Sequence, residues 1–257
     1  MDTGGSTGQS CAGSAPLVTV ITVVRNGATV AERTLKSVIS QRDQHLEYIV
    51  IDGGSTDGTV DLLRENDHAI DYWISESDDG IYDAMNKGIA HSSGDYLLFL
   101  NAGDELVVNL KEIEDYFKAG YVIVYGKASM LENDGRFVYT KGKKLRSPNK
   151  MITGMRLCHQ AIFYRRDAIG GGYDAGYRIL ADRVLTHELM KKHGINRTLF
   201  IDKVICTYYE GGFSRQNPEQ WKVEEIRFLR SNGRYLYAEY RRLSWFWKKM
   251  KRAARDV

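Results

Sequence analysis

The chain has 257 residues, of which 43% are hydrophobic, so it can bury a large core and form one sizeable α/β domain with additional segments. Its formal net charge of +3 excludes the strongly basic balance typical of nucleic-acid-binding proteins, and no run of 18 apolar residues offers a transmembrane helix. The three cysteines, Cys11, Cys158 and Cys206, show no metal-ligand spacing, which favours a reducing cytoplasm.

Residues 1–15 are small and polar and lack the apolar segment of a signal peptide, so we expect a disordered tail. Short apolar runs then predict strands at 17–24, 47–51, 72–75 and 96–100. Between them, apolar residues at helical spacing predict the buried stripes Ala31, Leu35, Val38 and Ile39; Val60, Leu62 and Leu63; and Ile81, Ala84, Met85 and Ile89. Strands that alternate with helices at this spacing indicate a mostly parallel sheet flanked by helices.

Each predicted strand ends in a polar or glycine-containing loop. These loops are Arg25-Asn26, Asp52-Gly53, Asp78-Asp79-Gly80 and Asn101 to Asp104. Right-handed crossovers place the carboxyl ends of parallel strands along one edge, where ligands bind in such sheets. We therefore expect a carboxylate-rich ligand crevice there. Asp104 follows Gly103 and is placed either to bind a hard divalent cation as a surface-edge carboxylate or to cap a short helix.

Four motifs fall in order along this half of the chain. They are Val-Thr-Val-Ile-Thr-Val-Val-Arg-Asn at 18–26, Ile-Asp-Gly-Gly-Ser-Thr-Asp-Gly-Thr at 51–59, Ser-Glu-Ser-Asp-Asp-Gly-Ile-Tyr-Asp-Ala-Met-Asn-Lys-Gly-Ile at 75–89, and Gly-Asp-Tyr-Leu-Leu-Phe-Leu-Asn-Ala-Gly-Asp at 94–104. With them the chain resembles glycosyltransferase family 2, the inverting enzymes of the GT-A fold, and within it the bacterial branch that builds exopolysaccharide, capsule and O-antigen. The resemblance is firm over 17–106 and thinner to about residue 214.

The resemblance implies a nucleotide-sugar site at the four loops. Val24, Arg25 and Asn26 would border the base, Asp52 would bond its edge, Asp78 and Gly80 would line the pocket, and Asn101, Ala102, Gly103 and Asp104 stand at the metal motif. Asp104 matches the metal-binding aspartate, so the implied cofactor is Mn²⁺ or Mg²⁺. The donor it implies is a UDP-sugar.

The sequence departs from the family pattern in two places. Many relatives carry Asp where Asn101 and Gly103 stand, which leaves one clear carboxylate for the metal, with diphosphate oxygens and water to complete its shell. Many also carry Arg where Met85 stands. Lys87 is nearby and is a candidate contact to diphosphate or acceptor, although it would lie on a different side of the helix. Neutralisation of the diphosphate is therefore less well supported than base binding.

The second half should contact the acceptor. We expect a strand at 121–125, a hairpin over 127–139 that turns at 132–135, and a basic loop at 141–150 that ordinary solvation also explains. His159, in a segment resembling a His-Gln strand entry of the same branch, is either a contact to diphosphate or acceptor or a hydrogen-bonded structural histidine.

Asp182 begins a helix that carries Val184, Leu185 and Leu189, and it matches the catalytic base of the family. An inverting transfer needs one carboxylate that takes the proton of the acceptor hydroxyl as its oxygen attacks the anomeric carbon. A helix cap is the competing role, although one carboxylate at a helix start can serve both.

After a predicted strand at 199–205, the segment 208–215 places two glycines beside aromatic residues. This composition suits a mobile lid, similar to the Gly-Gly loop of the family, or a plain loop. Arg215 in this segment is a further candidate for contact with acceptor or diphosphate.

The last segment is basic and amphipathic. Residues 241–257 contain seven Lys or Arg and one Asp, net +6, while Leu236, Tyr240, Leu243, Trp247 and Met250 recur at helical spacing. A basic helix with Trp and Phe suits the interface of an anionic membrane, where it would lie flat. The alternative is that the apolar stripe packs on the catalytic domain or on a second subunit of a homo-oligomer.

The sequence thus predicts a disordered tail at 1–15, a GT-A domain at 16–215 with nucleotide-binding (16–106) and acceptor (107–215) halves, and basic helices at 216–257. Its predicted function is metal-dependent inverting transfer of a sugar to a saccharide or polyprenyl-diphosphate-linked acceptor, in the cytoplasm or on the inner face of its membrane, without a nucleic-acid partner. A non-catalytic sugar-nucleotide-binding module is the main alternative. A sugar-phosphate nucleotidyltransferase fits less well, since Arg25-Asn26-Gly27 is not a Gly-rich phosphate loop.

Overall fold

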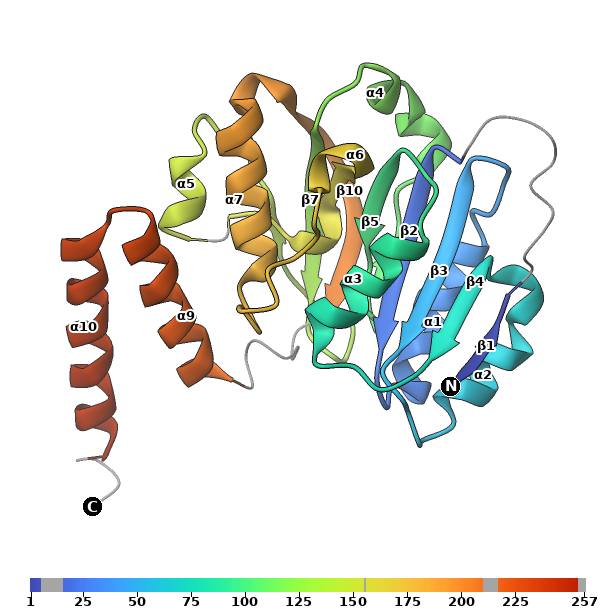
Figure 1. Cartoon of the computed structure of the whole chain (residues 1–257), viewed down its shortest axis with the longest axis horizontal. Coiled ribbons are helices and arrows are strands. Elements are labelled where there is room, and N and C mark those ends of the chain that lie inside the picture. Colours follow the sequence, from blue (N-terminus) through green and yellow to red (C-terminus); the bar gives the residue numbers. More distant parts are fainter. Residues whose placement is uncertain (6–15, 155, 210–216, 254–257) are drawn as a thin grey trace.

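The computed structural model describes residues 1–5, 16–154, 156–209 and 217–253. Within these ranges a ten-stranded sheet forms the centre of the molecule, and helices cover both of its faces (Figure 1). The strand order is β1-β4-β3-β2-β5-β9-β7-β10-β6, with β8 paired to β7. The predicted α/β class with a mostly parallel central sheet is confirmed.

The strands and helices have the following bounds. The strands are β1 Asp2–Gly4, β2 Val18–Val24, β3 Leu46–Asp52, β4 Tyr72–Ser75, β5 Tyr96–Phe99, β6 Glu105–Leu106, β7 Ile123–Leu131, β8 Phe137–Lys141, β9 Ile162–Arg165 and β10 Thr198–Tyr209. The α-helices are α1 Ala28–Ile39, α2 Thr59–Glu65, α3 Ile81–His91, α4 Glu114–Lys118, α5 Asn149–Ile152, α6 Arg166–Ile169, α7 Ala181–His193, α9 Pro218–Ser231 and α10 Tyr235–Ala253.

The first half of the sheet is parallel, as the alternation of strands and helices predicts. β2 pairs in parallel with β3 and β5, and β3 pairs in parallel with β4. Every residue of β2 is buried, because helices cover this strand on both sides. The four predicted loops therefore follow strand ends that point the same way.

The second half of the sheet mixes directions. β9 runs antiparallel to both β5 and β7, while β10 runs parallel to β7. The segments expected as a strand at 121–125 and the first arm of a hairpin belong to one strand, β7. The predicted turn at 132–135 does join β7 to β8, which pair as an antiparallel hairpin.

Two apolar cores lie on the two faces of the sheet. Side chains of α1, α2 and α4, among them Leu35, Leu63 and Phe117, pack on one face. Side chains of α3, α7 and α9, among them Met85, Leu189 and Phe228, pack on the other. Phe228 belongs to this second core, so the C-terminal helix α9 is docked on the α/β domain.

The beginning of the expected disordered tail is a strand. Asp2–Gly4 pairs antiparallel with Trp73–Ser75 of β4, at the edge of the sheet. The free hydrogen-bonding edge of β4 explains the difference, because any extended backbone can pair with it whatever its side chains. Residues 6–15 lie outside the described residues.

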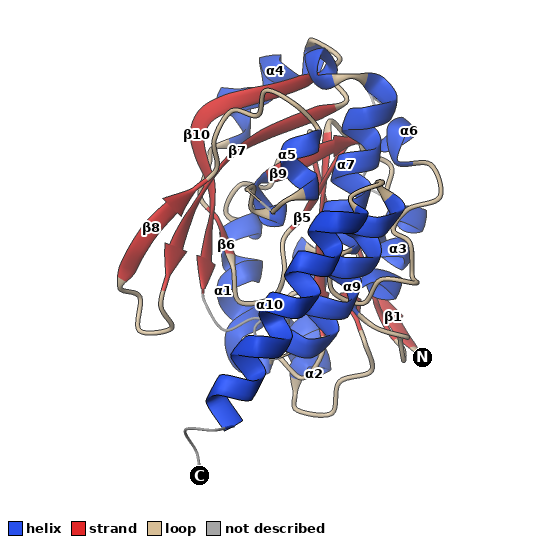
Figure 2. Ribbon diagram, turned by 90° about the vertical axis from the view of Figure 1, so that its left-hand side faces the viewer, coloured by secondary structure: helices blue, strands red, loops and turns tan. Residues whose placement is uncertain are grey.

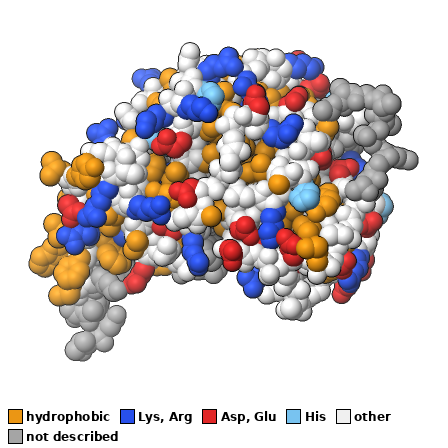
Figure 3. Space-filling view, in the orientation of Figure 1, with side chains coloured by type: hydrophobic (Ala, Val, Ile, Leu, Met, Phe, Trp, Pro, Cys, Tyr) orange, Lys and Arg blue, Asp and Glu red, His pale blue; other side chains and the backbone are white. Residues whose placement is uncertain are grey.

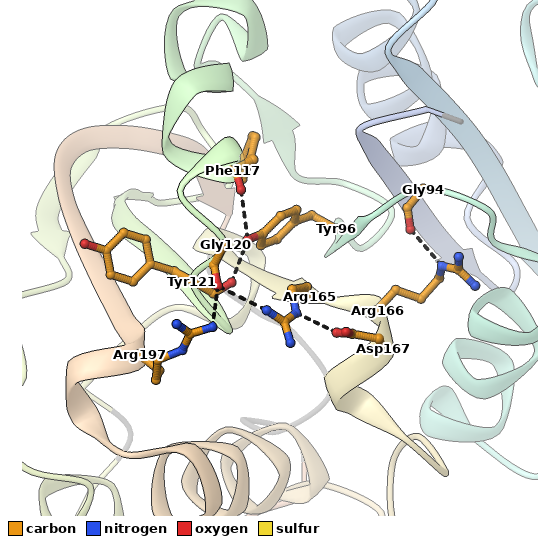
Figure 4. Close-up of polar contacts among 9 residues, drawn as sticks. All are labelled: Gly94, Tyr96, Phe117, Gly120, Tyr121, Arg165, Arg166, Asp167 and Arg197. Atoms are coloured by element: carbon orange, nitrogen blue, oxygen red, sulfur yellow. Dashed lines mark hydrogen bonds and ion pairs between the residues drawn. The ribbon is translucent and has the colours of Figure 1, made fainter. Parts of the chain in front are cut away.

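Hydrogen bonds from arginine and tyrosine side chains to backbone carbonyls lie at the end of the sheet where β5 begins (Figure 4). The Arg165 and Arg197 guanidiniums both donate to the carbonyl oxygen of Gly120, at 3.1 and 2.8 Å. The Tyr96 hydroxyl donates to the Tyr121 carbonyl at 2.6 Å. These bonds hold the start of β7 against β5 and β9, far from the carboxyl ends of the parallel strands.

The helix α10 packs on α9 through one face and exposes another. Tyr237 and Ala238 belong to a small core with Leu229, and Arg241 forms an ion pair of 2.9 Å with the buried Glu225. The predicted apolar stripe faces away from it: the exposed fractions are 90% for Leu236, 64% for Tyr240, 51% for Leu243, 62% for Trp247 and 53% for Met250. Hydrophobic and basic side chains accordingly gather over α10, at the lower left of Figure 3. The stripe therefore does not pack on the α/β domain of its own chain.

Candidate functional site

The four predicted loops meet at the carboxyl edge of β2, β3, β4 and β5. Backbone hydrogen bonds join them in pairs: Gly53 N donates to Val24 O at 2.9 Å, Glu76 N to Asp52 O at 3.0 Å, and Ala102 N to Val23 O at 3.3 Å. The expectation that these loops share one edge is confirmed. The right-handed order of the βαβ units explains it, because each crossover returns the chain to the other end of the sheet.

The loop after β2 is shaped by Asn26, whose φ of 49° places it in the left-handed region that Asn tolerates well. Its backbone N–H donates to Ser55 Oγ at 2.6 Å, and its side-chain Oδ1 accepts from Thr56 N at 2.9 Å. Val24 is buried while Arg25 and Asn26 are exposed. The first two loops thus form one unit that presents Arg25 to solvent.

Asp52 is fully buried and serves the loop that follows it. Its two oxygens accept from the hydroxyl and backbone N–H of Ser55, the latter at 2.9 Å, and from Ser75 Oγ at 2.6 Å. Asp52 has no solvent-exposed surface, so a bond from this carboxylate to a nucleobase edge would require the loop around it to open.

The loop after β4 places Asp78 close to Arg25. A side chain at Gly53 would collide with Asp78 and lie 3.3 Å from Arg25 Cδ, so the glycine allows the three segments to approach. Asp78 Oδ1 also accepts from Gly80 N at 3.0 Å. Lys87 Nζ is held by Glu76 at 2.8 Å and by the Ser77 carbonyl at 2.9 Å. Lys87 is therefore already paired with acidic and carbonyl oxygens of this loop.

The expectation that Asp104 is a surface-edge carboxylate is wrong. Asp104 is 5% exposed, and its oxygens accept from Gln160 Nε2 at 2.6 Å and from Tyr209 N at 2.9 Å. Burial raises its pKa to about 7, although the two donors act in the opposite direction. Tertiary contacts explain the difference, since Gln160 and Tyr209 arrive from distant parts of the chain.

A divalent cation does not fit this arrangement at Asp104. The Asp104 side chain is only 5% exposed and each of its oxygens already accepts one protein hydrogen bond, and no group of three or more His, Cys, Asp or Glu ligands gathers in the described part of the chain. Asn101 Oδ1, in the same loop, is an oxygen that could still accept a ligand: it is buried and has no hydrogen-bond partner among the described residues. We derive no reaction step through a metal ion at Asp104.

Asp182 lies in the first turn of α7, as predicted. Its Oδ1 accepts from the Tyr82 hydroxyl at 3.1 Å and from Arg183 N at 2.7 Å, and no described residue is hydrogen-bonded to its Oδ2. The same Tyr82 hydroxyl reaches the carbonyl of Ile179 at 2.8 Å. Burial raises the pKa of Tyr82 well above its usual value, so it remains a proton donor. One carboxylate oxygen is thus oriented, and the other is open to accept a proton.

A row of buried aromatic residues links the two ends of the site. His159 Nε2 lies 2.7 Å from the Tyr173 hydroxyl, and its ring stacks on Phe99. Tyr173 in turn packs against Tyr82, with ring centroids 5.2 Å apart. Burial lowers the pKa of His159, while the charge of Asp182 raises it. The structure therefore favours the structural role over a contact to diphosphate, since His159 is buried and paired with the Tyr173 hydroxyl.

Sequence reasoning missed several of these residues. Tyr82 stands inside the motif at 75–89, and Gln160 follows His159 in the His-Gln segment, but no local pattern marks them as partners of Asp182 and Asp104. Tyr173 has no signal at all. Of the segment 208–215, for which a lid was predicted, the first two residues end β10, while 210–215, with Arg215, lie outside the described residues.

The chain is similar in sequence to known glycosyltransferases. Residues 19–171 match the family model described as Glycosyl transferase family 2. An uncharacterised glycosyltransferase of Mycobacterium tuberculosis is 39% identical over 181 residues, which cover 66% of this chain and 67% of the relative. A PGL/p-HBAD biosynthesis glycosyltransferase of Mycobacterium bovis is 31% identical over 215 residues, which cover 78% and 80% respectively.

Two solved structures share the fold. S. aureus TarS 1–349 in complex with UDP-GlcNAc superposes with a TM-score of 0.63 at 18% identity, over 83% of this chain and 65% of that one. The mannosyltransferase PcManGT of Pyrobaculum calidifontis, in complex with GDP-Man and Mn²⁺, gives 0.60 at 17% identity, over 88% and 69%. This chain thus spans less than two thirds of the TarS chain.

Proposed function

Since the chain belongs to glycosyl transferase family 2 and has the predicted GT-A fold, we propose that it is an inverting enzyme of cell-surface polysaccharide synthesis. It transfers a sugar from a nucleotide-sugar donor to a saccharide or lipid-linked acceptor. The observation that carries this proposal is Asp182, with one oxygen held by Tyr82 and the other open. The Mycobacterium bovis relative, which is named for PGL/p-HBAD biosynthesis, supports a role in cell-surface glycan synthesis.

Asp182 acts as the general base in this proposal. Its free oxygen takes the proton of the acceptor hydroxyl while that oxygen attacks the anomeric carbon and the nucleoside diphosphate leaves. Tyr82 orients the carboxylate, and the start of α7 favours a negative charge there. No covalent sugar–enzyme intermediate is needed, so the configuration inverts.

The donor occupies the carboxyl edge of the sheet, between the loops at Arg25-Asn26, Asp78 to Gly80 and Asn101 to Gly103. UDP is the proposed nucleotide, supported by TarS, whose complex contains UDP-GlcNAc. The exposed Arg25 offers a positive charge for the nucleotide at this edge.

We also propose that turnover requires a divalent cation, without assigning Asp104 as its ligand. The support is the Mn²⁺ in the mannosyltransferase complex, and at this site the unpartnered Asn101 Oδ1. When bound, such an ion would stabilise the leaving diphosphate. Assaying donor turnover with Mn²⁺, Mg²⁺ or a chelator tests this requirement; equal rates in all three would remove the cation from the proposal.

We further propose that α10 brings this edge to an anionic membrane, where a polyprenyl-diphosphate-linked acceptor would reside. Its exposed Leu, Trp and Met side chains and its basic residues suit the headgroup region. The β7–β8 hairpin adds exposed Phe137, Val138 and Tyr139. In Figures 1 and 2 the free end of α10 and the β7–β8 turn point to the same side as the carboxyl ends of the parallel strands. No helix in the described part of the chain is long and apolar enough to cross a membrane.

The competing function is a non-catalytic module that binds sugar nucleotides. The enclosed Asp104, together with Asn101 and Gly103 in place of aspartates, favours it. Turnover separates the two functions, since a module would bind UDP without releasing it from a UDP-sugar.

Asp182→Asn tests the proposed function directly. We expect the variant to bind UDP as the wild type does and to lose roughly 10²–10⁴-fold in kcat, the usual contribution of a general base. The readout is UDP release from the nucleotide sugar that gives the largest thermal shift, with UDP affinity measured by calorimetry. A loss of UDP affinity with an unchanged kcat would move Asp182 to the donor site.

A further inference from the structure

The segment that leads into α7 is held by a carboxylate from a different helix. Glu224 of α9 is 2% exposed and accepts from three consecutive backbone N–H groups. Its Oε1 accepts from Arg178 N at 2.8 Å, and its Oε2 accepts from Ile179 N at 2.9 Å and Leu180 N at 3.0 Å. Gln220 of the same helix donates to Glu224 Oε1 at 2.8 Å and so fixes its rotamer.

These three N–H groups need this partner. Ile179 and Leu180 are buried, with exposed fractions of 6% and 4%, and their N–H groups precede the first turn of α7, where intrahelical acceptors are lacking. No side chain of α7 or of the preceding loop caps this helix start. Glu224 therefore holds the N-cap residue Leu180 and the two residues before it, from a helix that lies 44 residues further along the chain.

The same segment leads directly to Asp182. Ile179 is held on both sides: its N–H is bound by Glu224, and its carbonyl accepts from the Tyr82 hydroxyl, which also reaches Asp182 Oδ1. Asp182 follows Leu180 by two residues. A shift of the 178–180 backbone would thus move both the carboxylate and the hydroxyl that orients it.

We propose that Glu224 is a positioning residue for Asp182, through which the C-terminal helix α9 sets the geometry of the chemical step. This inference rests on the proposed function of Asp182 as the base. It makes α9 part of the catalytic unit and not a separate appendage. Glu225, the next residue, forms ion pairs with Lys222 at 2.6 Å and with Arg241, and it makes none of the bonds to residues 178–180.

The test compares Glu224→Gln and Glu224→Ala with Glu239→Gln, a matched control on α10 whose carboxylate pairs only with Arg230 and Arg242 near the surface. Gln keeps the volume and one acceptor oxygen but turns an amide donor toward an N–H group. We expect kcat for UDP release to fall roughly tenfold or more in Glu224→Gln and further in Glu224→Ala, since small misplacements of a base have effects of this size. UDP affinity should stay within about twofold, and Glu239→Gln should match the wild type.

A merely structural role would not produce this split between kcat and UDP affinity. A double-mutant cycle tests whether Glu224 acts through Asp182. In an Asp182→Asn background, Glu224→Gln should lower kcat no further, because the carboxylate that Glu224 positions is absent. Wild-type kcat in a folded Glu224→Ala, or an equal additional loss in the Asp182→Asn background, would overturn the proposal. Should both Glu224 variants unfold at the assay temperature, Gln220→Ala decides by the same criteria, since it removes only the donor that fixes Glu224.

The role of Asp182 as the base is tested independently of the Glu224 variants. If Asp182→Asn itself keeps wild-type kcat, the proposed base is wrong whatever the Glu224 variants do. If Asp182→Asn is inactive while the Glu224 variants are normal, only the positioning role fails.

Discussion

Replacing Asp104 by Asn should change how stability depends on pH. The buried carboxyl keeps its proton up to a pH of about 7, while in the unfolded chain it ionises near its usual value of 3.8. The folded state therefore binds more protons than the unfolded state between these values, so the free energy of unfolding falls as the pH rises from 4 to 7 and is constant above. A shift of about three pH units corresponds to about 4 kcal/mol in total, and to roughly 2–3 kcal/mol between pH 5 and pH 8.

Asparagine does not ionise, so the variant lacks this term. Its amide would face a donor, either Gln160 Nε2 or Tyr209 N, at a cost of about 1–3 kcal/mol that does not depend on pH. We expect the stability of the variant relative to the wild type to rise by roughly 2–3 kcal/mol from pH 5 to pH 8, and the variant to equal or exceed the wild type at pH 8. Urea unfolding of both proteins at the two pH values, with a chelator present, measures the difference.

The refuting result is a stability difference that stays constant between pH 5 and pH 8. Mn²⁺ adds an independent arm at pH 8. Because both oxygens of Asp104 are occupied by protein donors, we expect Mn²⁺ to shift the unfolding of both proteins equally. Stabilisation by Mn²⁺ that is confined to the wild type would restore Asp104 as the metal ligand.

Three further changes follow from the packing. Tyr82→Phe removes the hydroxyl donor to Asp182 Oδ1 and should lower kcat roughly tenfold, the value of one hydrogen bond, with unchanged UDP affinity; an unchanged kcat would contradict the orienting role. Gly88→Ala places a Cβ 2.5 Å from Ile21 Cγ2 and should lower the free energy of unfolding by about 1–3 kcal/mol in urea, whereas Gly154→Ala, with open space around it, should be nearly neutral. On α10, we expect roughly tenfold weaker sedimentation with phosphatidylglycerol vesicles when three exposed apolar residues become Ser; full-length protein that ignores these vesicles at low salt would instead point to a second subunit. The three residues are Leu243, Phe246 and Trp247.

Substituting exposed side chains tests membrane contact better than removing residues 241–257 would. Arg241 forms an ion pair with Glu225, which is 1% exposed, so its removal would disturb a buried charge as well as the membrane-facing stripe. Substitution of the exposed side chains alone keeps the contact between α9 and α10. Turnover of a soluble acceptor analogue should then stay close to that of the wild type.

The sequence by itself determined the elements, their order and the family. Runs such as 17–24 and 72–75 are short, apolar and bounded by turn residues, so local pattern is enough to place β2 and β4. The shared edge of the four loops also followed, because crossover handedness leaves few ways to arrange consecutive βαβ units. The position of Asp182 at a helix start was also predictable, because helix boundaries have local sequence signals.

Only the tertiary structure decided which polar residues are enclosed and what they contact. Asp104 reads as an open carboxylate in sequence, yet Gln160 and Tyr209 close over it from 56 and 105 residues away. The segment before α7 is held by Glu224, which in sequence is one acidic residue of an amphipathic helix. Burial and hydrogen-bond partners depend on which distant segments the sheet brings together, and no local spacing records that choice.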